Sequence, residues 1–182
     1  MKRLGILATQ TLKLVRTHPA QWIVGMLLVL SPTLPAAAQT ALQLNQYCQI
    51  SQADASRKES LRRAAFEQND AQAREQYEAL VAAHARALQQ CRAVTWPQEQ
   101  AVWLRLYPCD LQPGILEAVL DRIANLGYNQ VYAEAFYSGM VLLPAADNPT
   151  AWPSVVTARG YERRDLLAEA IAKAQPRGLE TY

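Results

Sequence analysis

Aliphatic residues alternate with aromatic or charged ones in two segments of the chain, residues 101–107 and 130–137. A period of two is the pattern of a β-strand whose two faces meet different surroundings. Both segments are therefore predicted to be strands. The face without aliphatic residues carries Trp103, Arg105, Tyr107, Tyr132, Glu134 and Phe136.

Between these segments, apolar residues recur at helical spacing. The helix is expected to begin at Pro113-Gly114, because proline suits a first turn, and to end at Gly127, which can form a left-handed cap. Its apolar stripe is predicted to be Ile115, Val119, Ile123 and Leu126. Two strands joined by one helix form a right-handed crossover, so the strands are expected to be parallel neighbours.

A second amphipathic helix and a third strand are predicted further along the chain. The helix should end at Gly178, and the strand should begin at Leu179. The apolar positions of this helix are Leu166, Leu167, Ala170, Ile171 and Ala174. The preceding connection, residues 137–162, contains glycine and several prolines, which predict turns and no regular element.

Two opposite charges, Arg105 and Glu134, occur on the non-aliphatic strand faces. An ordinary sheet core would reject both groups unless they were satisfied. Polar groups on the inner face near the carboxyl ends of strands are typical of the mouth of a (β/α)8 barrel. The alternative is a structural ion pair without a catalytic role, since structural pairs are also common.

Several short pieces of this region match one family in order: Gln100-Ala-Val-Trp-Leu-Arg105, Gly127-Tyr-Asn-Gln-Val-Tyr-Ala-Glu-Ala-Phe136, Val141-Leu-Leu-Pro144, Trp152, Asp165-Leu-Leu-Ala-Glu-Ala-Ile171 and Arg177-Gly-Leu-Glu180. Over residues 100–182 the chain thereby resembles the glycosyl-hydrolase-like family ten, which are secreted or lipoprotein (β/α)8 barrels. It departs from that family at Phe136, where an arginine is frequent, and at Pro176, where the family keeps a regular helical turn.

The resemblance implies a polysaccharide or cell-wall glycan as substrate. No cofactor and no metal-binding residue are predicted within this chain. The catalytic acids of this family are expected on later strands, so no catalytic residue is predicted within this chain. Trp152 could stack on a sugar ring, or it could simply pack the loop down. The residues predicted to contact substrate are Arg105, Asp110, Glu134, Tyr137 and Trp152.

A complete (β/α)8 barrel takes about 250 residues, whereas this chain has 182. The expected fold is therefore α/β, an incomplete (β/α)8 barrel with three parallel strands, belonging to the N-terminal part of a longer glycoside hydrolase-like protein that is inactive by itself. The alternative is a non-enzymatic envelope or periplasmic protein, whose helical hairpin binds a partner and whose half-barrel is a remnant.

A helical hairpin is predicted ahead of the strands, because residues 40–94 contain neither glycine nor proline. Ser56 and Glu59 have the spacing of a capping box, and Asn69 or Asp70 can cap a second helix. The apolar stripe of the second helix is Tyr77, Val81, His84, Leu88 and Cys91. A weaker partner stripe is Leu44, Cys48, Leu61 and Ala65.

Four basic residues precede the first acidic residue, Asp54, and an apolar run follows them at residues 22–30. This pattern predicts a signal peptide over residues 1–38, cleaved after Ala38, and a secreted or periplasmic protein that meets a membrane only during export. An uncleaved membrane anchor is the alternative. The predicted organisation is then a signal peptide (1–38), a hairpin (39–97) and a barrel fragment (98–182). Without the signal the chain is slightly acidic, which argues against a nucleic-acid partner.

Three cysteines allow three single disulfides, and the sequence alone does not choose among them. In an exported chain we favour Cys48–Cys91, because folding of the hairpin can bring these two residues together, and this leaves Cys109 as the odd thiol. The histidine that remains after signal removal, His84, is expected to be a satisfied packing residue. A Ser-His-Asp triad or a histidine-based zinc site would need this residue near the strand ends.

Overall fold

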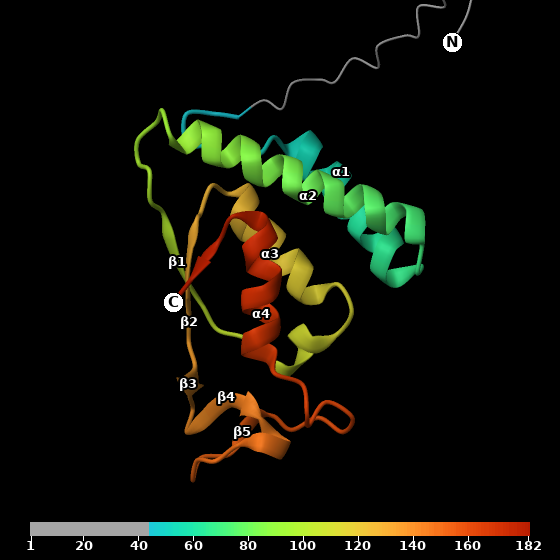
Figure 1. Ribbon diagram of the computed structural model, residues 1–182, viewed down its shortest axis with the longest axis vertical. Coiled ribbons are helices and arrows are strands. Elements are labelled where there is room, and N and C mark those ends of the chain that lie inside the picture. The colour runs from blue at the N-terminus through green and yellow to red at the C-terminus, as the bar shows by residue number, and fades with distance from the viewer. Residues whose placement is uncertain (1–43) are drawn as a thin grey trace, which may run out of the picture. The chain divides into compact units, whose positions relative to one another are not determined.

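The computed structural model describes residues 44–182. Its first two helices form the predicted hairpin. Helices α1 (Gln52–Glu67) and α2 (Ala71–Arg92) fold back on each other (Figure 1). The expected stripe of α2 is confirmed, because Tyr77, Val81, His84 and Leu88 are all buried. The predicted signal peptide, residues 1–38, lies outside the described residues.

The start of α1 differs from the prediction. Its N-cap is Ser51, whose hydroxyl accepts a hydrogen bond from the backbone N–H of Asp54. The capping box predicted at Ser56 and Glu59 is wrong, because both residues lie inside the helix. For α2 the predicted cap is confirmed at Asp70, whose carboxylate accepts from the backbone N–H of Ala73 at 3.0 Å.

The partner stripe predicted for α1 is only partly confirmed, because Ala65 is buried on the helix and Cys48 is buried ahead of it. Leu44 and Cys48 precede the helix, and Leu61 is only half-buried. The buried residues of α1 are Lys58, Arg62 and Ala65. An apolar stripe could not reveal this side of the helix, because two of its three buried positions carry charges.

Three parallel strands form the first sheet, in the order β1-β2-β6. Strand β1 (Ala101–Leu104) pairs with β2 (Gln130–Ala133), and β2 pairs with β6 (Glu180–Thr181). Helix α3 (Ile115–Asn125) connects the first two strands, and α4 (Leu166–Ala174) precedes the third. The prediction of a mixed α/β fold with three parallel strands is confirmed.

The stripe predicted for α3 is only partly confirmed, because Ile123 is buried and Val119 packs half-buried against the core. Leu116, Leu120 and Ile123 are buried, whereas Ile115 and Leu126 are exposed. Two charged residues, Glu117 and Asp121, are buried on the same helix. The predicted left-handed end is confirmed, with a φ of 91° at Gly127.

Residues 137–162 form regular structure where turns were predicted. Strands β3 (Phe136–Tyr137), β4 (Met140–Pro144) and β5 (Ser154–Val156) make a second sheet in the order β3-β4-β5. The predicted strand 130–137 consequently ends at Ala133, and its last residues join this second sheet. Proline marked the segment as irregular, but Pro144 occupies a strand end, where a missing N–H costs little. Short 3-10 helices complete the chain: η1 (Pro108–Leu111), η2 (Ala145–Asp147) and η3 (Gln175–Arg177).

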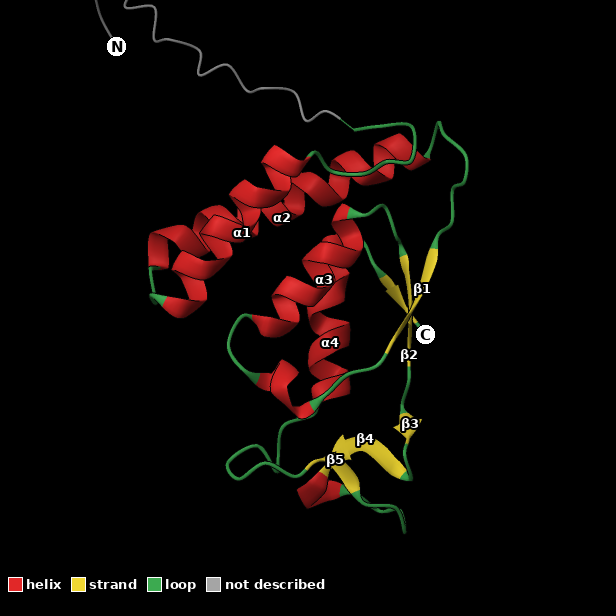
Figure 2. Ribbon diagram, turned by 180° about the vertical axis from the view of Figure 1, so that it is seen from behind, coloured by secondary structure: helices red, strands yellow, loops and turns green. Residues whose placement is uncertain are grey.

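Helices cover the first sheet on one face only. In Figure 2 the strands stand at one side of the ribbon, and α3 and α4 lie together on the other. The aliphatic face of β1 and β2 meets these helices and includes the buried Val131. On the opposite face the described residues place no helix, and Trp103 is 70% exposed there.

The favoured disulfide is confirmed. Cys48 and Cys91 are bonded with 5.7 Å between their Cα atoms, and Cys109 is a free, exposed thiol. The bond ties the segment before α1 to the end of α2. The same segment contacts α3, because the backbone N–H of Ile50 donates to the carbonyl of Asn125 at 2.9 Å.

Candidate functional site

Arg105 and Glu134 form a two-point ion pair just beyond the carboxyl ends of β1 and β2. The Arg105 Nε donates to Oε2 of Glu134 at 2.6 Å, and its Nη2 donates to Oε1 at 3.1 Å. The two side chains are 44% and 21% exposed, so the pair faces solvent. The Arg105 hydrogen bond holds the pKa of Glu134 below its usual value. The predicted proximity of the two charges is therefore realised.

Tyr137 lies beneath this pair. The Arg105 guanidinium lies 4.8 Å from the centre of the Tyr137 ring, a cation–π distance. The Tyr137 hydroxyl donates to the carbonyl of Leu106 at 2.5 Å, and burial raises its pKa. The hydroxyl is therefore already hydrogen-bonded, and the ring packs against the Arg105 guanidinium.

The carboxylate of Asp110 is hydrogen-bonded to the backbone of the turn after β1. Its Oδ2 accepts from the N–H of Tyr107 at 2.7 Å, and its own N–H donates to the Tyr107 carbonyl at 2.9 Å. The residue is only 9% exposed. Asp110 therefore holds the turn that follows β1, and its carboxylate points into that turn.

A row of aromatic side chains crosses the uncovered face of the first sheet. Trp103 on β1 and Tyr132 on β2 are register partners. The rings of Tyr132 and Tyr182 stack at 5.0 Å with 19° between their planes. We call Trp103, Tyr132 and Tyr182 the aromatic row. Sequence analysis placed the first two on this face but missed Tyr182, because only the pairing of β6 beside β2 brings that residue alongside.

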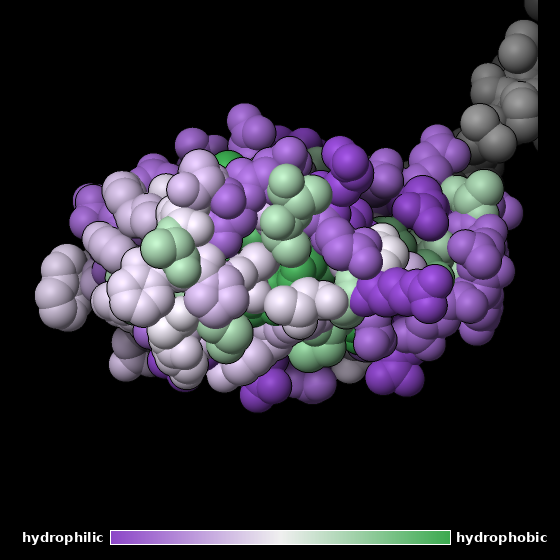
Figure 3. All heavy atoms as spheres, turned by 90° about the horizontal axis from the view of Figure 1, so that it is seen from below, coloured by the Kyte–Doolittle hydropathy of each residue, from purple (hydrophilic) through white to green (hydrophobic). Residues whose placement is uncertain are grey.

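Trp152 packs apart from the Arg105–Glu134 pair. Its ring meets the edge of Phe136 at 5.2 Å and is 53% exposed. Asn148 donates from its amide to the Trp152 carbonyl at 2.6 Å and shapes this loop. From the end that carries the second sheet, pale and green side chains gather toward the strands and purple ones toward the helices (Figure 3). At this end the surface is therefore less polar beside the strands than beside the helices.

The exposed groups of this face are suited to contact a ligand. A glycoside-cleaving acid needs a raised pKa so that it holds a proton at neutral pH. The pKa of Glu134 moves in the opposite direction, and Asp110 is committed to the backbone. The face instead offers exposed ring surfaces beside a charged pair with free lone pairs and donors.

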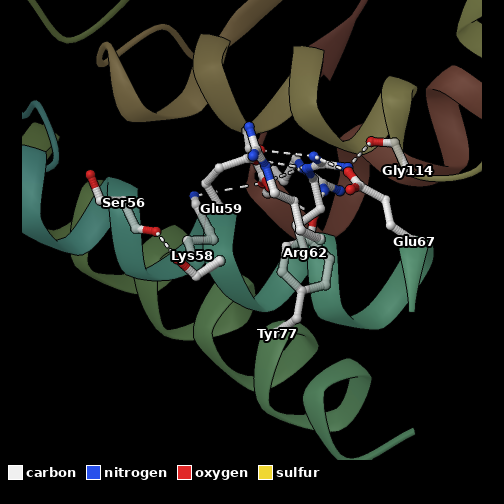
Figure 4. A network of polar contacts seen from close by, with 11 residues as sticks. Ser56, Lys58, Glu59, Arg62, Glu67, Tyr77 and Gly114 are labelled. Carbon is white, nitrogen blue, oxygen red and sulfur yellow. Dashed lines mark hydrogen bonds and ion pairs between the residues drawn. The ribbon is translucent and has the colours of Figure 1, made fainter. Parts of the chain in front are cut away.

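A second polar cluster, which sequence analysis missed, joins the hairpin to the sheet unit (Figure 4). Asp121 on α3 accepts from Tyr77 on α2 at 2.7 Å and from Arg177 at 2.9 Å, and Lys58 on α1 lies 3.6 Å from it. Burial lowers the pKa of Lys58, and burial raises that of Tyr77. The only sequence signal was charge at α1 positions 58 and 62, one helical turn apart.

Arg62 shows how this cluster continues along α1 (Figure 4). Its guanidinium pairs with Glu59 at 2.7 Å and Glu67 at 3.2 Å, and it donates to the carbonyl of Gly114 at 3.1 Å. Gly114 has a φ of 81°, and an added Cβ there would lie 2.7 Å from the Arg62 Nη1. The close approach of α1 to the start of α3 therefore requires glycine at this position.

His84 was predicted to be a satisfied packing residue, and only the packing part is confirmed. The ring is 2% exposed, but neither ring nitrogen has a hydrogen-bond partner among the described residues. Burial lowers its pKa to about 4. The ring is therefore buried near charged residues of α1 without a hydrogen bond to any described residue.

Residues 44–182 contain no group of three side chains suited to hold a metal ion. Within the same residues, no helix is both long and apolar enough to cross a membrane. No protein-family model, curated protein or solved structure matches the chain.

Proposed function

We propose that this chain is the glycan-binding N-terminal part of a secreted glycoside hydrolase-like protein. The observation that carries the proposal is the aromatic row on an uncovered sheet face, next to the Arg105–Glu134 pair. Sugar rings present C–H faces that pack on aromatic rings and hydroxyls that bond to charged groups. Trp103, Tyr132 and Arg105 supply both kinds of contact side by side.

The order of the strands supports the barrel part of the proposal. In a (β/α)8 barrel, consecutive parallel strands are neighbours and helices cover their outer face. Strands β1, β2 and β6 follow that order, with α3 and α4 on one face. The aromatic row would then line the inner face, and the hydrolytic carboxylates would come from residues other than those described. The disulfide is compatible with the exported location that the signal-like sequence predicts.

The alternative, a hairpin that binds a partner protein, is less well supported. The buried residues of α1 and α2 face the rest of the molecule through the Asp121 cluster. Neither helix exposes a large apolar side chain. A partner would therefore meet a polar helical surface, which offers little hydrophobic area for stable association.

A binding experiment with the exported chain tests the proposal. Tryptophan fluorescence and affinity electrophoresis measure how tightly it binds soluble cell-wall and polysaccharide fragments. Trp103→Ala and Tyr132→Ala should each weaken binding about tenfold, which corresponds to about 1.4 kcal/mol. Trp96→Ala is the matched control, because Trp96 is 86% exposed and lies in the connection that precedes β1. If no glycan is retarded, or if Trp103→Ala binds as tightly as the unmodified chain, the proposal is wrong.

A further inference from the structure

Arg92, the last residue of α2, carries a buried guanidinium with no counter-charge in the described residues. The residue is 8% exposed, and its Nη1 donates to no atom of residues 44–182. Burial lowers its pKa. An arginine remains charged in proteins, so this burial is costly unless a partner compensates it.

Arg92 is one of the residues that line a pocket of about 480 Å³ between α2 and the amino-terminal ends of β2 and β6. This is the opposite end of the sheet from the Arg105–Glu134 pair, which follows the strands. The polar side chains around Arg92 are Arg86, Gln89, Asn129, Gln175 and Glu180. The pocket is therefore separate from the proposed glycan face.

The charges of this pocket favour an anion. Arg86 and Arg92 are both basic, and the single acidic residue, Glu180, already accepts a hydrogen bond from the Tyr182 hydroxyl at 2.8 Å. The Asn129 amide is also committed, to the carbonyl of Gln98 at 3.3 Å and the N–H of Gln100 at 2.7 Å. The amides of Gln89 and Gln175 supply further neutral donors at the wall.

We propose that this pocket binds a small oxyanion, held at two points by the Arg92 guanidinium and at its rim by Arg86. The planar fork of arginine matches both a carboxylate and a phosphate or sulfate group. The volume is within the range of small-molecule sites, which leaves room for a ligand body beyond the anionic group. Such a ligand would provide the counter-charge that the described residues do not.

Calorimetric titration and thermal unfolding of the full chain test this site with sodium phosphate, sodium sulfate and sodium glucuronate. Each is compared with sodium chloride at equal ionic strength, so that general screening is the same. At least one oxyanion should bind and raise Tm above the chloride value, and the three salts separate tetrahedral anions from a sugar carboxylate. Arg92→Met should weaken this binding at least about tenfold.

Two variants of Arg92 and one control variant keep the test decisive. Arg92→Met removes an uncompensated buried charge, so its Tm in chloride should equal or exceed that of the unmodified chain. Arg92→Lys retains the charge but loses the fork, and it should bind more weakly even if Arg92→Met does not fold. Arg163→Met, at an exposed position outside the pocket, should bind unchanged. Oxyanion binding no stronger than chloride, or equal binding by Arg92→Lys and the unmodified chain, overturns the proposal.

Discussion

The Tyr77 hydroxyl donates a hydrogen bond of 2.7 Å to Oδ2 of Asp121, 44 positions further along the chain. The other oxygen of Asp121 accepts from Arg177 at 2.9 Å. With Lys58 3.6 Å away, one carboxylate connects both hairpin helices to α3 and η3. One buried carboxylate therefore joins the two hairpin helices to α3 and to the segment before β6.

Asp121→Ala should destabilise the protein strongly. The substitution leaves Lys58 and Arg177 buried without their shared counter-charge, and breaking a buried pair in this way costs about 3–5 kcal/mol. Urea unfolding followed by circular dichroism measures the change. Asp147→Ala, at an exposed position, should stay within about 0.5 kcal/mol of the unmodified chain. A loss below about 1 kcal/mol for Asp121→Ala would show that the cluster does not hold the hairpin in place.

Acidification should weaken the fold through His84. Its pKa in the folded chain is about 4, below the usual 6.5, so the unfolded chain binds a proton at higher pH than the folded chain does. The stability that the neutral ring supports is complete above pH 6.5 and is lost as pH falls toward 4. The loss should be on the order of 2 kcal/mol.

Unfolding free energies at several pH values for the unmodified chain and for His84→Leu isolate this effect. The charged groups that act on the ring are Lys58, Asp54, Asp121 and Arg57. They are present in both proteins, so their own titration cancels in the comparison. The variant should show a flatter profile between pH 6.5 and 4. Parallel profiles for the two proteins would mean that His84 does not titrate with unfolding.

Loss of the Cys48–Cys91 bond should cost about 3–4 kcal/mol, because the bond closes a long loop of the unfolded chain. The two cysteines are 43 positions apart. A Cys48→Ala, Cys91→Ala double variant should unfold at lower urea concentration with a similar or slightly larger slope. Cys109→Ser is the control and should be nearly neutral, because that thiol is exposed and unbonded. Equal midpoints for the double variant and the control would contradict the prediction.

Much of the fold was predictable because local patterns report on backbone geometry. The period of two around Val131 and the glycine at position 127 correctly predicted β2 and the end of α3. The same reasoning missed the second sheet, because residues such as Pro144 were interpreted as turn signals although Pro144 lies at a strand end. On α3 it found Ile123 but wrongly included Ile115 and Leu126, and a search for apolar residues overlooks the buried Asp121.

Arg105 and Glu134 could be predicted as neighbours from the sequence, since both lie on the same face of parallel strands that a crossover helix makes adjacent. The sequence by itself determined the hairpin and the three parallel strands, because spacing and chain direction are local properties. It favoured Cys48–Cys91 but did not exclude the other two pairings. Only the tertiary structure decided which charges are buried, where Tyr182 stacks and that Arg92 lacks a partner within residues 44–182. Those facts depend on which surfaces distant segments present to one another, and residue order does not record them.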